Sequence, residues 1–277
     1  MTILARYMAL VDRIQARMSL PPIVEVDFPP VEHDADRSSE FGVFVLGDGS
    51  VGLCFVLLGD TLQVLHERFE PARLVGRDPA ALARELIDGD QTARTLAMGA
   101  INAIGQCVFE RARFELDVDT DSIGLLAPCA DDVVGMVGLF PSLPERILAS
   151  GARLVVIERR PRQVLEHPRL SFSLDPSSLQ ACNKVLCTSS VVLNDSLDEI
   201  LGHCRRTESV SVVGPTAGFL PDPLFEAGVD VVGGTRVTDA AELIRRRRAG
   251  ERWMPLATKY CIRRSDYPGY EALLAAL

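Results

Sequence analysis

The stretch DVVGMVGLF at residues 132–140 is an apolar run that enters glycines, and the following PSLPERILASG, at 141–151, is typical of a helix. The same alternation of apolar runs and helical segments continues to Gly250. Short runs rich in Val, Ile and Leu that alternate with helices predict a parallel sheet with both faces covered. We therefore predict a Rossmann-like α/β domain over residues 126–277.

Further elements of this domain follow from the same pattern. Strands are predicted at 152–160, 183–190, 208–218 and 229–237, and helices at 193–204, 221–228 and 238–250. The last helix is predicted to begin at a Thr238 cap and to end in four arginines and Gly250, as suits a helix C-terminus. Residues 253–277 are expected to add a strand and a helix, whose position the pattern leaves open.

The N-terminal part has a different organisation. An amphipathic helix is predicted over 3–18, a strand over 23–28 and a β-hairpin over 41–58 with its turn at GDGS (47–50). Helices are expected over 79–88 and 91–111, and the second is apolar nearly all round, which is typical of a buried helix. Because strands and helices do not alternate here, we predict a smaller α+β domain over residues 1–125.

Composition excludes several classes of function. A length of 277 residues suits two domains, and the net charge of −9 with a pI near 5.0 argues against binding nucleic acid or an anionic membrane. No stretch approaches the roughly 20 apolar residues of a membrane span, and charges interrupt the apolar stretch at the N-terminus, unlike the continuous apolar region of a signal peptide. With seven scattered cysteines, we expect free thiols and a cytoplasmic protein. A homodimer is the default on base rates alone.

Ligands of open parallel sheets bind at the carboxyl ends of the strands, so the residues there are candidates for the site. The first strand ends in Gly135-x-x-Gly138-x-Phe140, a partial dinucleotide fingerprint that also suits a tight turn. Glu158 follows Gly138 by twenty residues, the place of an acid that holds a ribose, although a solvated glutamate is equally plausible.

The remaining strand ends are rich in small polar residues. The third strand leads into Thr188, Ser189 and Asn194, and the fourth into Gly214-Pro215-Thr216. Hydroxyl and amide groups in such loops commonly orient a ligand. Ser196 with Glu199 also fits a capping box, so part of the first loop can serve only to start a helix.

Motifs for metals and nucleophiles are weak. The sequence has no CxxC, HxxxH, HExxH or GxSxG, so we expect no hydrolytic triad. His203-Cys204, the run EHDAD at 32–36 and the run Asp117-x-Asp119-x-Asp121 are each interpreted as structural, the last because it lacks the glycine and glutamate of a calcium loop.

Several segments together resemble a known family, the heavy-metal chelation domains: GMVGLFPSLPERI, VIERRP, VLCTSSVVLNDSLDEIL and VVGPTAGFLPDPLFEAGVDVVGG, with the helix ARTLAMGAINAI. The resemblance implies a Rossmann-like C-terminal domain, an N-terminal domain like that of enolase, and a site in the cleft between them to which Asn102 contributes. Ser189, Val191 and Asp195 depart from the family's glycine, threonine and glycine, which suggests an altered ligand.

Three functions follow as alternatives. The first is a protein that binds a small molecule or a metal chelate in the interdomain cleft, as the resemblance implies. The second is an enzyme with an adenosine-type cofactor, S-adenosylmethionine or NAD, held at Gly135–Phe140 with Glu158 on the ribose. The third is a structural or regulatory subunit. The cofactor expected is accordingly a divalent metal ion or an adenosine-type molecule.

Overall fold

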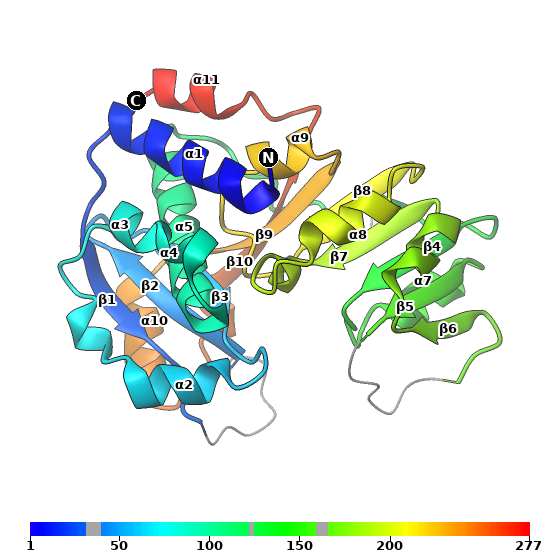
Figure 1. Ribbon diagram of the computed structural model, residues 1–277, viewed down its shortest axis with the longest axis horizontal. Helices are drawn as coiled ribbons and strands as arrows, with labels where there is room; N and C mark the ends of the chain where they lie inside the picture. Colours follow the sequence, from blue (N-terminus) through cyan, green and yellow to red (C-terminus); the bar gives the residue numbers. More distant parts are fainter. Residues whose placement is uncertain (32–39, 122–124, 159–165) are drawn as a thin grey trace.

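A computed structural model describes residues 1–31, 40–121, 125–158 and 166–277. It contains a seven-stranded sheet of order β10-β9-β8-β7-β4-β5-β6 and a three-stranded sheet of order β1-β2-β3 (Figure 1). The large sheet belongs to the C-terminal part of the chain and the small sheet to the N-terminal part. The predicted fold class, a Rossmann-like α/β domain preceded by a smaller α+β unit, is confirmed.

The large sheet is parallel except at one edge. Its strands are β4 (Val133–Val137), β5 (Arg153–Ile157), β6 (Leu170–Ser173), β7 (Lys184–Thr188), β8 (Ser209–Val213), β9 (Val231–Val237) and β10 (Ala257–Arg263). All neighbours from β6 to β9 pair in parallel, and β10 pairs with β9 antiparallel. Strand β6 was not predicted, because LSFS is short and lacks the Val/Ile signature of the inner strands.

The helices of this part lie between the strands in the chain, except α11, which follows the last strand. They are α7 (Pro144–Ala149), α8 (Leu197–His203), α9 (Asp222–Glu226), α10 (Ala240–Arg248) and α11 (Tyr270–Ala275), with the 3₁₀ helices η3 (Pro176–Ala181), η4 (Ser189–Val192) and η5 (Met254–Leu256). The predicted Thr238 cap is wrong. Asp239 caps α10 instead, because its carboxylate accepts the backbone N–H of Glu242 at 2.9 Å.

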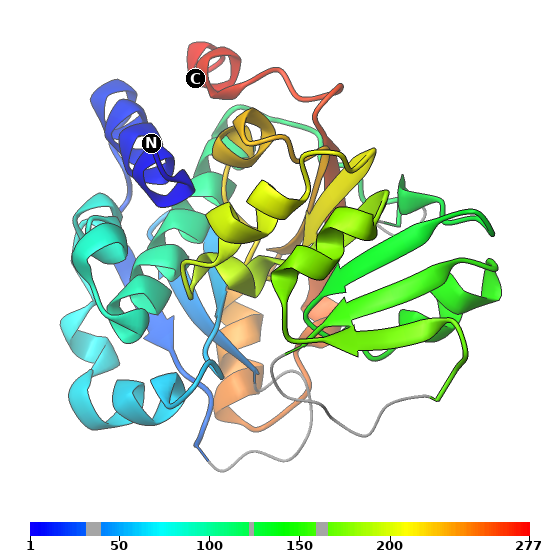
Figure 2. The ribbon, with the colours of Figure 1, turned by 45° about the vertical axis from the view of Figure 1, so that its right-hand side comes forward.

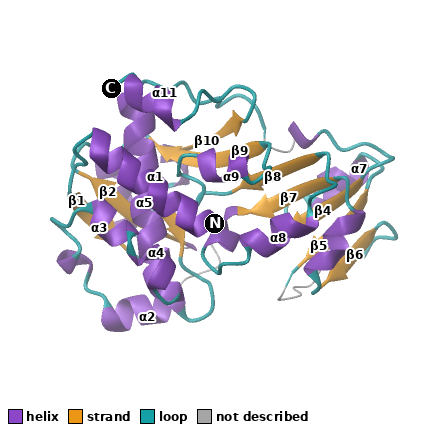
Figure 3. Cartoon of the chain, turned by 45° about the horizontal axis from the view of Figure 1, so that its top comes forward, coloured by secondary structure: helices purple, strands orange, loops and turns teal. Residues whose placement is uncertain are grey.

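The structure places the C-terminal tail, which the sequence left open. Its strand is β10, and its helix α11 lies beside α1 and α5 (Figure 3). Asp222 at the start of α9 anchors α11: its Oδ1 accepts the N–H of Tyr270 at 2.9 Å, and its Oδ2 accepts the Tyr267 hydroxyl at 2.7 Å. Burial of Asp222 raises the pKa of its carboxyl group.

The N-terminal part follows the predicted order. It comprises α1 (Ile3–Arg17), β1 (Ile23–Asp27), β2 (Phe41–Leu46), β3 (Val51–Phe55), α2 (Thr61–Arg68), the 3₁₀ helix η2 (Pro71–Arg73), α3 (Pro79–Ala83), α4 (Glu85–Asp88) and α5 (Gln91–Arg111). The helix predicted over 79–88 is two short helices separated at Arg84. Helix α5 is buried along most of its length, as its composition predicted. The likeness to the enolase N-terminal domain stays a prediction.

The small sheet is packed between helices from both parts of the chain (Figure 2). One face contacts α5, so closely that a Cβ at Gly52 would lie 2.1 Å from the carbonyl oxygen of Gly99. The other face meets α10 and Trp253, and its core residues are Val43, Val45, Val51, Leu53, Leu243 and Ile244. Hydrophobic contacts therefore cross the predicted boundary between residues 125 and 126.

No helix in the described ranges is long and apolar enough to span a membrane.

Candidate functional site

Four loops meet at the carboxyl edge of the large sheet. Strands β8, β7, β4 and β5 are adjacent and parallel, so the loops that follow Val213, Thr188, Val137 and Ile157 lie along one edge. The chain runs from β4 to β5 on one side and returns to β7 on the other, which makes the β4–β7 boundary the switch point of the sheet. Ligand sites of open α/β sheets lie at such a point.

The loop after β4 turns tightly at Gly138. This glycine has φ +78°, and a Cβ there would lie 2.7 Å from Cγ2 of Thr188 in the neighbouring loop. Only glycine combines that backbone conformation with so close a contact. Phe140 is half-buried and packs against the hydrophobic core that includes Ile147 and Leu148 of α7. The loops on the two sides of the switch point are thus in direct contact.

Gly135 lies elsewhere than the partial fingerprint suggested. It sits in the middle of β4, where a Cβ would lie 2.6 Å from Cδ2 of Leu179. Its small size therefore lets η3 pack against the strand, and Gly138 alone of the two glycines belongs to the loop.

Glu158 lies at the end of β5 and holds the neighbouring loop. Its Oε2 accepts the backbone N–H of Leu139 at 3.0 Å. This bond gives Glu158 a role in positioning the turn at Gly138, and its predicted contact with a ribose remains a prediction.

The loop after β7 is a compact network of hydroxyl groups. Thr188 Oγ1 lies 3.0 Å from Ser190 Oγ and accepts the Ser190 N–H at 3.4 Å, at the start of η4. Ser189 is buried, and its Oγ would lie 2.6 Å from a Cβ at Gly214. The side chain at position 189 thus touches the next loop.

The end of the same loop corrects one prediction. Asn194 Oδ1 accepts both the N–H of Ser196, at 3.2 Å, and its hydroxyl, at 2.6 Å. Because the Ser196 hydroxyl is directed to Asn194, the predicted capping box with Glu199 does not form, and α8 begins without a side-chain cap. Asp195 is exposed with φ +57°, a conformation that aspartate tolerates better than most residues and that glycine adopts readily.

The loop after β8 connects the two sheets. Gly214 has φ +140°, Pro215 is half-buried, and Thr216 is buried with its Oγ1 accepting the N–H of Phe55 from β3 at 3.0 Å. Asn102 of α5 donates its amide to the carbonyls of Thr216, at 2.8 Å, and Leu53, at 2.7 Å. The loop is therefore held from both sides by the N-terminal part.

Asn102 does not face an open cleft. Its side chain is fully buried, and its Oδ1 is buried without a hydrogen-bond partner. Asn194 bonds within its own loop, so the structure does not join these two asparagines.

Gln106, four residues after Asn102, was not predicted, although the spacing places both amides on one face of α5. It donates to the carbonyl of Gly218 at 2.8 Å and to the hydroxyl of Tyr260 at 3.0 Å.

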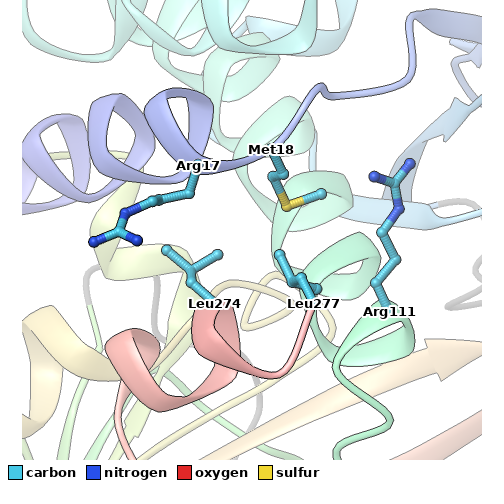
Figure 4. A pocket seen from close by; sticks show the side chains of 5 residues that line it. All are labelled: Arg17, Met18, Arg111, Leu274 and Leu277. Carbon is cyan, nitrogen blue, oxygen red and sulfur yellow. The ribbon is translucent and has the colours of Figure 1, made fainter.

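A cavity lies away from these loops. It has a volume of about 540 Å³ and opens between the ends of α1 and α5 and the helix α11. Figure 4 shows Arg17 and Arg111 on opposite sides of it, with Met18, Leu274 and Leu277 between them. None of the sequence-predicted site residues lines this cavity.

The described residues do not fit a bare soft metal ion. Within them, no three His, Cys, Asp or Glu side chains gather into a group that could hold a metal. Burial raises the pKa of the Cys54 and Cys107 thiols to about 12 and that of Cys182 and Cys204 to about 11. These thiols are protonated at neutral pH, so a soft metal ion, which binds the thiolate, would have to displace their protons.

In the described residues, the side chains of the weak metal motifs make local hydrogen bonds within the protein. His203 Nδ1 lies 3.0 Å from the amide of Gln180, whereas Cys204 Sγ faces the carbonyl of Ile200 at 3.2 Å. Asp117 Oδ1 accepts backbone N–H groups of its own turn. The run at 32–36 lies outside the described residues.

Comparisons with known proteins agree with this fold. Family models with the description "Putative heavy-metal chelation" match residues 121–265, just over half of the chain, and residues 40–105. An uncharacterized protein of Methanocaldococcus jannaschii is 26% identical over 155 residues, which span 54% of this chain and 57% of that protein.

Two solved structures have the same fold over nearly the whole chain. Both are proteins of unknown function from the DUF364 family. The one from Desulfitobacterium hafniense has a TM-score of 0.69 at 19% identity and covers 94% of this chain and 100% of its own. The one from Pyrococcus horikoshii has a TM-score of 0.67 at 14% identity, covering 95% and 100%. With the match to residues 121–265, the chain belongs to the family whose domains are described as "Putative heavy-metal chelation".

Proposed function

We propose that the protein binds a small polar organic molecule, alone or as the chelator of a metal ion, at the switch point between β4 and β7. The observation that carries this proposal is the contact between Gly138 and Thr188, which brings the two diverging loops together at the position where α/β sheets hold ligands. The hydroxyl groups of Thr188 and Ser190 are half-buried there and supply donors and acceptors for a polar molecule.

The family description names a heavy metal, and the described residues favour a metal ion bound together with an organic ligand over a bare ion. The described residues offer no cluster of ligands for a bare ion, and the buried thiols are protonated. A metal ion that arrives with its own organic ligands needs only hydrogen bonds to that ligand's oxygen and nitrogen atoms. The loops after β4 and β7 provide groups of this kind.

We also propose a cytoplasmic setting, since all seven cysteines are free and six are buried.

An adenosine-type cofactor is the competing proposal, supported by the place of Glu158 beside the glycine turn. Two observations weigh against it. Glu158 already accepts the N–H of Leu139, and α7 begins only at Pro144, so the turn at Gly138 does not open directly into a helix as a dinucleotide fingerprint does.

Thermal-shift and calorimetric titrations distinguish these proposals. The probes are Ni²⁺ alone, citrate alone, nickel–citrate, S-adenosylmethionine and NAD. A ligand that binds the native state and not the unfolded state raises the melting temperature, by an amount that grows with the ratio of its concentration to its Kd. We expect a response to citrate or nickel–citrate and none to Ni²⁺ alone. Thr188→Val should weaken that binding about fivefold, the value of one neutral hydrogen bond of roughly 1 kcal/mol.

Thr207→Val is the matched control. Thr207 is also half-buried and donates one hydrogen bond, to the carbonyl of Cys182, but it precedes β8 and so lies at the opposite edge of the sheet. It should leave binding unchanged. Equal weakening by both variants, or a response to Ni²⁺ alone that neither variant changes, would contradict the proposed site. A response confined to an adenosine cofactor would favour the alternative.

A further inference from the structure

The edges of the two sheets differ in how they are covered. Strand β10 is paired by the N–H of Cys261 to the carbonyl of Asp117 at 2.8 Å. At the small sheet, Ile23 of β1 bonds to the backbone at residues 76–77, and Phe55 of β3 bonds to Thr216. Strand β6 ends the large sheet on the other side, and no residue of the described ranges pairs with its outer side (Figure 1).

The backbone groups on that outer side follow from the pairing with β5. The carbonyl of Arg169 accepts the N–H of Leu154 at 2.8 Å, and that of Ser173 accepts the N–H of Glu158 at 3.3 Å. In a parallel pair, alternate residues direct their groups to the neighbour. Phe172 therefore directs both its N–H and its C=O outward, as do the carbonyl of Leu170 and the N–H of Leu174.

The side chains along this edge are apolar and exposed. Phe172 is 40% exposed and Leu174 is 72% exposed. Phe172 lies on the same face of the sheet as Leu170, two residues before it, and Leu174 follows at a bend just past the end of the strand. The segment 170–174 carries no charge, and Arg169 and Asp175 flank it with opposite charges.

We propose that β6 pairs antiparallel with β6 of a second copy of this chain, about a two-fold axis that passes beside Phe172. In this register Phe172 faces the partner's Phe172, and the two residues exchange N–H···O=C bonds. Leu170 faces the partner's Leu174, whose N–H meets the free carbonyl of Leu170. All the outward groups named above are then satisfied. The carbonyl of Leu174 gains no partner, because the N–H of Leu170 that faces it already bonds to the carbonyl of His167 at 3.0 Å.

The pattern of side chains selects a second copy as the partner. The same register sets serine opposite serine on one face and apolar side chains together on the other. It also brings Arg169 near the partner's Asp175, although within one copy Arg169 donates to the carbonyl of Leu148 at 2.8 Å and Asp175 accepts the N–H and the hydroxyl of Ser177. An isologous two-fold contact requires this self-complementarity. The strand is short, so the pairing gives a dimer that forms with rising concentration and not an obligate one.

Cross-linking tests the register directly. Phe172→Cys, in a Cys129→Ser background that removes the exposed cysteine, places two thiols on the axis with Cα atoms about 5.5 Å apart, within reach of a disulfide. Mild oxidation should give a covalent dimer on a non-reducing gel. Leu174→Cys in the same background is the matched control, because its two copies lie about 13 Å apart and should not cross-link. No dimer for Phe172→Cys, or equal dimer for both variants, overturns the proposal.

Sedimentation of the full chain over a concentration series supplies a second measurement. The wild type should form a dimer with rising concentration, as should Phe172→Tyr. Phe172→Arg should remain a monomer, because the axis brings two like charges together, and its unchanged circular dichroism would show that it is folded. A wild-type monomer at every concentration, a dimer unaffected by Phe172→Arg, or a monomer that pairs instead with another protein's strand overturns the proposed contact.

Discussion

Asn102 shows how one side chain can join two sheets. Its amide bridges the carbonyl groups of Leu53, in the small sheet, and Thr216, in a loop of the large sheet, at a position with no exposed surface. A buried carbonyl that loses its donor is costly, because water cannot replace it. The side chain therefore positions the loop after β8.

We expect Asn102→Ala to lower the free energy of unfolding by about 2–3 kcal/mol, because two buried carbonyl groups lose a donor. Urea denaturation followed by far-UV circular dichroism measures this loss. The matched control is Gln63→Ala, which removes an exposed amide bonded to Glu67 and should cost less than roughly 0.5 kcal/mol. Similar losses for both variants would show that the buried amide contributes nothing beyond an ordinary surface bond.

Helix α10 illustrates how an element can have a role that its sequence pattern does not reveal. Its four arginines were interpreted from their place near a helix C-terminus. In the structure, Arg247 pairs with Asp27 and Arg248 with Glu25, so the end of the helix is joined to β1. The guanidinium of Arg247 also lies 5.9 Å from the ring centre of Trp253. Sequence periodicity cannot predict such pairs, since their members are more than two hundred residues apart.

The arginines of α10 should differ sharply in their effect on stability. The Arg247 side chain is 5% exposed and that of Arg248 63% exposed. Arg247→Ala leaves Asp27 without its buried partner and should cost about 3 kcal/mol or more of unfolding free energy. Arg248→Ala removes an exposed pair worth about 0–1 kcal/mol. Thermal and urea denaturation of both variants measure these losses of unfolding free energy. Equal losses would show that the buried Arg247–Asp27 pair stabilises the protein no more than the exposed pair does.

At the level of elements, most of the fold could be predicted from the sequence. The strands β4, β5, β7, β8 and β9 were predicted because each is an apolar run between turns, as inner parallel strands are. Strand β6 was missed since an edge strand is half exposed and needs no continuous apolar run. The cap at Asp239 was assigned one residue too early, because two adjacent residues were both suitable caps.

For the whole molecule, the gathering of the strand-end loops followed from the parallel sheet, since its topology brings Gly138, Glu158, Thr188 and Gly214 to one edge. The details of the candidate site could not be predicted in the same way. Whether Gly135 lies in the strand or in the turn depends on where the strand ends, and the burial of Asn102 depends on packing between distant segments. Neither the residue at which a strand ends nor the packing between distant segments can be inferred from residue spacing.

The packing of the small sheet also bears on how the molecule unfolds. Trp253, the single tryptophan, is 2% exposed and packs with Leu243 and Ile244 against the face of the small sheet that includes Val45. Its fluorescence therefore reports the contact between the N-terminal sheet and the C-terminal part of the chain. Two domains with independent cores would lose this contact and their secondary structure in separate steps.

We expect a single cooperative transition in urea, with Trp253 fluorescence and far-UV circular dichroism giving the same midpoint, because the shared core couples the two parts. Leu243→Ala removes a fully buried side chain from this core and should cost about 2–4 kcal/mol, shifting both signals together. Val75→Ala, at an apolar side chain that is 47% exposed, is the control and should leave both midpoints nearly unchanged. A fluorescence transition that precedes the loss of secondary structure, or a Leu243→Ala variant that shifts only the fluorescence, would show instead that residues 1–125 and 126–277 unfold as separate units.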